Sequence, residues 1–199
     1  YAAAQNGARV ILAEDKSRFG GSLLTSEVTI GNQSGQEWAE KIISELKSMP
    51  NVVVKNRSQV FGYYDHNMLV MSERVSDHLP KTDKYIPKQR LWYIRAKEVV
   101  ISSGSIERPL VFGNNDAPGV MLSSAAKEYL KIYGVLVGKK PIIFTNNDSG
   151  YETAIEFKKN GIDPIILDTR KEANSEIIKE AKELNIIIKF SYVVVAAKG

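Results

Sequence analysis

Residues 8–22 read ARVILAEDKSRFGGS, and this stretch decides the fold. It opens with a short apolar run rich in β-branched side chains, which predicts a buried parallel strand ending at Glu14 and Asp15. The preceding residues 1–7 read as the last turns of a helix closed by Gly7. A helix end, a tight glycine and a strand that ends on an acid make the second half of a βαβ unit. We therefore expect the chain to start inside such a unit.

Two features of this stretch suit a dinucleotide. Glu14 stands where a carboxylate accepts hydrogen bonds from both hydroxyls of an adenosine ribose. Gly20 and Gly21 let the backbone approach a pyrophosphate without a Cβ clash, and Ser22 adds a hydroxyl donor. A solvated strand end and a plain surface turn are the alternatives when each feature is taken alone. Together they are typical of two-dinucleotide-domain flavoproteins and favour nucleotide binding.

The residues that follow predict the rest of one lobe. Gln36–Ser48 carries apolar side chains at helical spacing, so we expect an amphipathic helix there. Val52–Val54 predicts a strand, and Gln59–Ala96 predicts a β-meander with a polar hairpin loop. Glu98–Ser102 predicts another buried strand.

Three further positions are candidates for cofactor contact. Val60 stands where such folds offer backbone groups to an adenine edge, although a core valine is an equal alternative. Ser103 and Gly104 directly follow the predicted strand Glu98–Ser102, at the strand end where α/β sheets bind ligands. A glycine at that place permits close approach of a cofactor.

Residues 140–199 predict a second α/β unit. Strands are expected at 140–145, 164–167 and 186–188, with helices up to Lys159 and over 173–184. The turn Asn146–Gly150 occupies the place of a Gly-x-Gly-x-x-Gly phosphate loop but keeps one of its glycines, and Asp148 would repel a pyrophosphate. We interpret this lobe as a Rossmann-like scaffold that has lost its nucleotide, with Asp168 as a plain strand-end acid.

The elements together predict an α/β fold of the Rossmann-like, two-dinucleotide-binding-domain (FAD/NAD(P)-binding) class with a β-meander insertion, truncated at both ends. Its expected domains are 1–135, a partial first dinucleotide-binding domain, and 136–199, a partial second lobe.

Composition narrows the classes of function. The net charge of +4 is spread along the 199 residues, which gives no reason to expect nucleic-acid binding. Apolar runs fall short of the roughly 20 residues of a membrane span. The chain has no cysteine, which excludes disulfides and thiolate metal sites within it and fits a cytoplasmic protein. His66 and His78 have no second ligand at useful spacing, and no nucleophile–base pair is visible. We therefore expect no metal site and no catalytic residue here.

Longer stretches resemble the alpha subunits of heterotetrameric sarcosine oxidases, and the resemblance covers nearly the whole chain. They are residues 7–12 and 20–24, VFGYYDHN at 60–67, RLW at 90–92, IERPLVF at 106–112, NND at 114–116, PGVM at 118–121 and FTNNDS at 144–149. The chain departs from the family pattern in having Glu14 then Asp15 where Asp then Glu is more common. It also has Ser102-Ser103-Gly104 in place of Ala-Thr-Gly.

The resemblance implies an enzyme that oxidatively demethylates sarcosine to glycine. Such an enzyme produces hydrogen peroxide with formaldehyde or 5,10-methylenetetrahydrofolate. It implies NAD in this region, FAD and FMN largely in the beta subunit, and tetrahydrofolate in a C-terminal domain outside this sequence. The implied partners are beta, gamma and delta subunits. Carried over by position, the NAD contacts are Glu14, Asp15, Lys16, Ser22 and Val60. The chain alone is expected to be inactive.

Two alternatives remain open. One is a subunit of a related amine dehydrogenase or oxidase, of the opine oxidase, proline dehydrogenase or cyanide synthase type, holding another adenine nucleotide. The other is a scaffold lobe with a vestigial nucleotide site.

Overall fold

The structure, a computed structural model, describes residues 1–198. These residues form two compact units, Tyr1–Gly104 and a second that begins at Ser105. In chain order the elements are α1 (Ala2–Gln5), β1 (Val10–Ala13), η1 (Gly21–Leu24), β2 (Thr29–Ile30), β3 (Gln33–Ser34), α2 (Gly35–Ser48), β4 (Val52–Lys55), β5 (Ser58–Tyr64), η2 (Asp65–Asn67), β6 (Met68–Arg74), β7 (Gln89–Arg95), α3 (Ser123–Tyr133), β8 (Ile142–Thr145), α4 (Ser149–Lys159), β9 (Ile165–Asp168), α5 (Glu176–Glu183) and β10 (Ile187–Phe190). The expected boundary between cofactor domains, after residue 135, stays a prediction.

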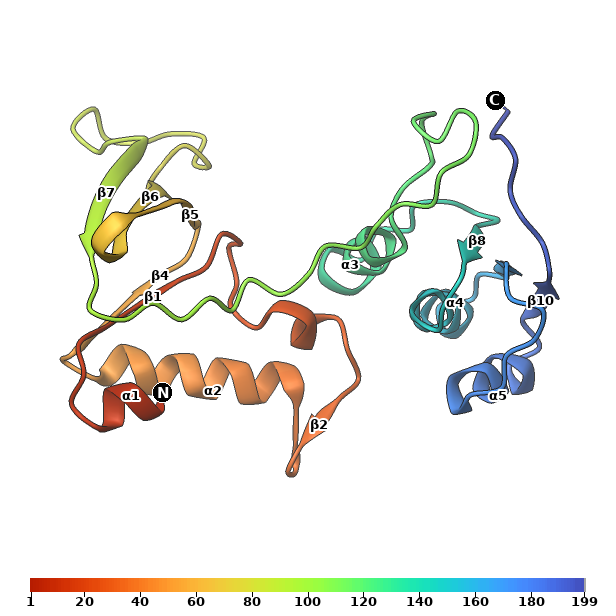
Figure 1. The fold of residues 1–199 in the computed structure, drawn as a ribbon, viewed down its shortest axis with the longest axis horizontal. Coiled ribbons are helices and arrows are strands. Elements are labelled where there is room, and N and C mark those ends of the chain that lie inside the picture. Colours follow the sequence, from red (N-terminus) through yellow and green to blue (C-terminus); the bar gives the residue numbers. More distant parts are fainter. Residues whose placement is uncertain (199) are drawn as a thin grey trace. The chain divides into compact units, whose positions relative to one another are not determined.

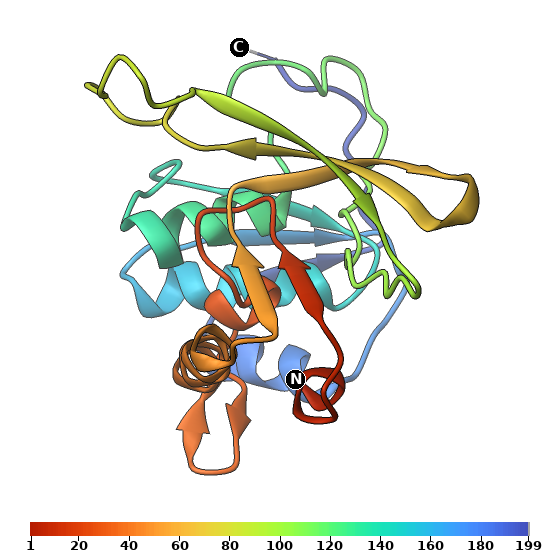
Figure 2. The ribbon, with the colours of Figure 1, turned by 90° about the vertical axis from the view of Figure 1, so that its left-hand side faces the viewer.

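The first unit is built on the parallel pair β1 and β4, in which Val10 pairs with Val52. Helix α2 connects the two strands and lies beside them (Figures 1 and 2). Its N-terminus has a reciprocal capping box: the Ser34 hydroxyl accepts the Glu37 N–H, and the Glu37 carboxylate accepts the Ser34 N–H. Its buried Ala39 and Leu46 fix the apolar face. The helix expected at Gln36–Ser48 and the strand expected at Val52–Val54 are both present.

The meander β5-β6-β7 is an antiparallel sheet within the same unit (Figure 2). Met71 in its central strand is 1% exposed and forms part of the core. The register shifts between Val60 and Gly62, so β5 carries a bulge there. The polar segment between β6 and β7 is the expected hairpin loop.

The second unit is a parallel three-stranded sheet in the order β10-β9-β8. Helices α4 and α5 pack with it around a core that includes Tyr151, Ile166 and Ile178 (Figure 1). Gly150 opens α4 at a close approach to β8, since a Cβ on it would lie 2.8 Å from the Thr145 Cβ. The one glycine that remains in the turn Asn146–Gly150 therefore serves helix–strand packing.

The predicted strand Glu98–Ser102 is wrong. The segment belongs to no helix or strand, and Val100 and Ile101 are 88% and 71% exposed. Its apolar pattern suits a buried strand, but a strand also needs a neighbouring backbone, and no part of residues 1–198 pairs with it. None of the helices in residues 1–198 has both the length and the apolar character that a membrane span requires.

Candidate functional site

The candidate nucleotide site begins at the carboxyl end of β1. The Glu14 N–H donates to the Lys55 carbonyl at 2.9 Å, and the Glu14 carbonyl accepts the Ser58 N–H at 2.8 Å. The first bond continues the parallel pairing of β1 and β4 by one residue, and the second ties Glu14 to the start of β5. Glu14 is thereby fixed where a ribose-binding acid stands in dinucleotide folds.

The Glu14 side chain is partly buried and turned back on its own loop. Its Oε1 accepts the Lys16 N–H at 3.0 Å. Partial burial raises the pKa of the Glu14 carboxyl; the Lys16 N–H opposes this, and the neighbouring Asp15 carboxyl adds to the rise. Asp15 and Lys16 are exposed. An acid placed this way is accessible to a ligand, and hydrogen bonds from hydroxyl donors would stabilise its charged form.

The glycine turn has the backbone that its sequence requires. Gly20 has φ 126° and Gly21 has φ 52°, a region that side-chain-bearing residues rarely adopt. A Cβ on Gly20 would lie 3.0 Å from the Leu24 side chain, whereas a Cβ on Gly21 would meet nothing within 4 Å. Gly20 is thus needed for packing, while Gly21 and the exposed Ser22 present open backbone. This arrangement fits the close approach of a pyrophosphate.

The remaining sequence-predicted residues divide into two groups. Val60 lies in β5 two residues after Ser58, which bonds to Glu14, and is 42% exposed. The start of β5 is therefore brought beside the acid. Ser103 and Gly104 lie outside any helix or strand and are exposed. Gly104 has φ 67°, with open space at its Cβ position.

Sequence reasoning missed a polar cluster that joins β4 to the meander. Glu73 in β6 accepts the Lys55 ammonium at 2.8 Å and the Trp92 indole N–H at 2.7 Å. Burial would raise the pKa of Glu73, but the bonds from Lys55 and Trp92 outweigh it and hold the pKa below its usual range. The cluster is formed by residues 18 or more apart in sequence, so no local pattern announces it.

In the second unit, the acid at the end of β9 is hydrogen-bonded by neighbouring side chains. Asp168 is fully buried, and its carboxylate accepts the Tyr151 hydroxyl at 2.7 Å and the Arg170 guanidinium at 2.7 Å. Arg170 also donates to Asp148 in the preceding turn at 2.8 Å. Burial would raise the pKa of Asp168, but its bonds from Arg170 and Tyr151 lower it below the ordinary range. The acid at this strand end is thus held by protein donors.

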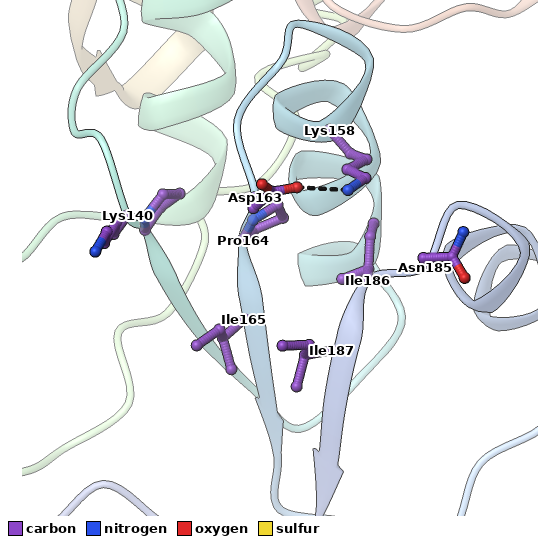
Figure 3. A pocket seen from close by; sticks show the side chains of 9 residues that line it. Lys140, Lys158, Asp163, Pro164, Ile165, Asn185, Ile186 and Ile187 are labelled. Atoms are coloured by element: carbon purple, nitrogen blue, oxygen red, sulfur yellow. Dashed lines mark hydrogen bonds and ion pairs between the residues drawn. The ribbon is translucent and has the colours of Figure 1, made fainter.

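A surface pocket of about 310 Å³ lies in the same unit, at the end of the sheet where its strands begin (Figure 3). Its walls include Pro141, Ile165 and Ile187, and the Lys158 ammonium at its rim is paired with Asp163. Ligands of open α/β sheets bind at the opposite, carboxyl ends of the strands. This pocket therefore lies at the end of the second unit's sheet that is not the usual place for a ligand. The described part of the chain holds no group of three or more His, Cys, Asp or Glu residues that could bind a metal ion.

Known proteins resemble this chain in sequence and in fold. No family model matches it. The alpha subunit of sarcosine oxidase from Rhizobium meliloti (strain 1021) is 43% identical over 181 residues, which is 90% of this chain and 18% of that protein. The corresponding subunit from Corynebacterium sp. (strain U-96) is 34% identical over 175 residues, 87% of this chain and again 18% of that protein. The chain thus spans less than a fifth of the length of these relatives.

Solved structures share the fold at low sequence identity. L-proline dehydrogenase from P. horikoshii matches with a TM-score of 0.66 and 23% identity, over 86% of this chain and 33% of that one. Thioredoxin reductase from T. acidophilum matches with a TM-score of 0.68 and 15% identity, over 99% of this chain and 60% of that one. The fold is therefore that of FAD/NAD(P)-binding oxidoreductases, as predicted. With the sequence matches, this confirms the resemblance found in the sequence: the chain is homologous to one stretch of the sarcosine oxidase alpha subunit.

Proposed function

We propose that this chain binds NAD, and that Glu14 accepts hydrogen bonds from the adenosine ribose hydroxyls. The observation that carries the proposal is the partly buried Glu14 carboxylate at the carboxyl end of β1, with its pKa raised by burial. The open backbone at Gly21 supports a pyrophosphate position, and Ser22 supplies a hydroxyl there. Asp15, Lys16 and Val60 would flank the adenosine. Ser103 and Gly104 remain proposed cofactor contacts.

Bound NAD supplies hydride-transfer chemistry at its nicotinamide ring. The chain's own residues bind and orient the adenosine half. Glu14 discriminates in favour of a free 2′-hydroxyl, because a 2′-phosphate would place like charges together. The second lobe is proposed to hold no dinucleotide, a view supported by the engagement of Asp168 with Tyr151 and Arg170.

At the level of the whole enzyme, we propose that this chain is part of the alpha subunit of a complex that oxidatively demethylates sarcosine to glycine. Its products would be hydrogen peroxide and either formaldehyde or 5,10-methylenetetrahydrofolate. Beta, gamma and delta subunits, with FAD and FMN largely in the beta subunit, would complete it. Support comes from the name and sequence identity of the curated relatives, of which this chain spans 18%.

The deciding experiment is to purify the natural full-length protein, denature it and identify the released nucleotide by mass spectrometry. We expect NAD at about one per chain, lost in Glu14→Ala and retained in Glu172→Ala, which removes an exposed acid of the second unit. FAD or ATP in place of NAD would favour the related amine dehydrogenases. Absence of any nucleotide would favour a scaffold with a vestigial site.

A further inference from the structure

The residues that carry the proposed ribose contact form a short loop, Glu14–Ser17, called the acid loop below. Each of its four backbone carbonyls accepts one hydrogen bond from outside the loop. The four bonds are Ser58 N–H to Glu14 O at 2.8 Å, Arg74 Nη2 to Asp15 O at 3.0 Å, Arg57 N–H to Lys16 O at 2.9 Å and Asn56 Nδ2 to Ser17 O at 2.7 Å. A surface loop held at every carbonyl has little backbone freedom left.

Two of these bonds depend on residue identity. Backbone N–H groups hold two of the carbonyls, and any residue other than proline supplies such a donor. The other two carbonyls are held by the side chains of Asn56 and Arg74. These side chains are therefore the parts of the arrangement that a substitution can remove without altering the fold.

Both side chains come from segments with restricted backbones. Arg57 has φ 50° in the turn between β4 and β5, and its carbonyl accepts the Arg74 N–H at 2.9 Å. Ser58, which is 1% exposed, donates its hydroxyl to the Asn56 carbonyl at 2.9 Å. The turn is thus tied both to the acid loop and to the end of β6.

The meander fixes the position of Arg74. Its neighbour Glu73 is bonded to Lys55 of β4 and to Trp92 of β7, so the end of β6 is held against β4. Arg74 then reaches a backbone 59 residues away in sequence. The meander insertion therefore provides a donor to the acid loop that the β1–β4 pair does not contain.

We propose that Asn56 and Arg74 are positioning residues, which hold the acid loop in the conformation that receives the adenosine ribose. The inference rests on the proposed function. Its physical basis is preorganisation: a loop that is already ordered loses less entropy when the ligand binds. Neither side chain needs to touch the nucleotide.

The test measures NAD affinity in the natural full-length protein by titration calorimetry. Arg74→Ala and Asn56→Ala should each lower the affinity for NAD by roughly tenfold, which corresponds to the loss of one hydrogen bond. Arg74→Lys should restore much of the affinity, because an ammonium can also donate to the Asp15 carbonyl. Arg95→Ala is the matched control, since Arg95 is an exposed arginine at the end of β7. It should bind as the unaltered protein does.

A second ligand separates positioning from general damage to the fold. An NAD analogue with 2′,3′-dideoxyribose on its adenosine side lacks the hydroxyls that the acid loop receives. Its affinity should be nearly the same in the unaltered protein and in Arg74→Ala. Amides 14–18 should exchange hydrogen faster in Arg74→Ala and Asn56→Ala, with the rest of the first unit unchanged.

The outcomes distinguish the two proposals. Unchanged NAD affinity in both alanine variants, or an equal loss for NAD and the dideoxy analogue, would overturn the positioning role while leaving the NAD site intact. An unaltered protein that does not bind NAD would overturn the proposed function, and the positioning role with it.

Discussion

The pKa of the Glu14 carboxyl at the candidate site is raised, chiefly because the side chain is partly buried. An ionised carboxylate accepts from two hydroxyls, whereas a protonated one does so poorly. NAD affinity should therefore fall as the pH drops through this raised pKa, beginning above the range of an ordinary glutamate at about 4.3. Titrations between neutral pH and the limit of stability would measure the profile.

The Glu14→Gln variant is the control for this pH dependence. It should bind NAD more weakly at neutral pH and lose the acidic limb of the profile. A raised folded-state pKa also means that ionised Glu14 disfavours folding above that pKa, so this variant should unfold at an equal or higher temperature at pH 7. An acidic limb that persists in Glu14→Gln would assign the titration to another group.

At the scale of elements, sequence patterns correctly predicted those helices and strands whose formation depends on residues close together in the chain. The apolar spacing of α2 and the alternation of the meander are local, and both elements formed as expected. The strand Glu98–Ser102 did not form, because pairing depends on a backbone that its own residues cannot supply. The same limit applied to the site. Glu14 and the glycines follow a local motif, whereas Arg74 reaches the acid loop only through the folded meander.

The contact between β9 and α4 is called the joint below. Substitutions in it would measure how much its buried acid stabilises the second unit. Asp168→Asn removes the charge that faces Arg170 and should lower the free energy of unfolding by about 3 kcal/mol. Tyr151→Phe removes one hydrogen bond to that carboxylate and should cost about 2 kcal/mol. Urea unfolding at pH 7, followed by circular dichroism, would measure both, with the exposed Glu183→Gln as a neutral control.

The effect of this joint on folding stability changes with pH in the opposite direction from the effect of Glu14 on folding stability. The pKa of Asp168 is lowered in the folded state, so its stabilising effect is complete above the ordinary aspartate pKa of about 3.9 and is lost as the pH falls through the lowered value. The difference between the unaltered protein and Asp168→Asn should therefore shrink in acid. A constant difference across that range would contradict the assigned ion pair.

At the scale of the whole molecule, the two units are joined through a segment without helix or strand. Residues 96–111 contain Val100 and Ile106, which are 88% and 92% exposed. Each unit has buried residues of its own, such as Met71 in the first and Ile166 in the second. The chain therefore divides into parts that can each stay folded when the segment between them is cut.

Limited proteolysis tests this division in the 199-residue chain. A glutamate-specific protease should cut first after the exposed Glu98, because proteases prefer exposed segments that open without global unfolding. Glu107 should be cut more slowly, since its carboxylate accepts the N–H groups of Ser123 and Ser124 at the start of α3. Glu98→Gln should delay fragmentation, and mass spectrometry of the first products would locate the cut. An earliest cut inside α2 or α4 would mean that the units open before the connecting segment does, and a resistant Glu98 would mean that this segment is covered in solution.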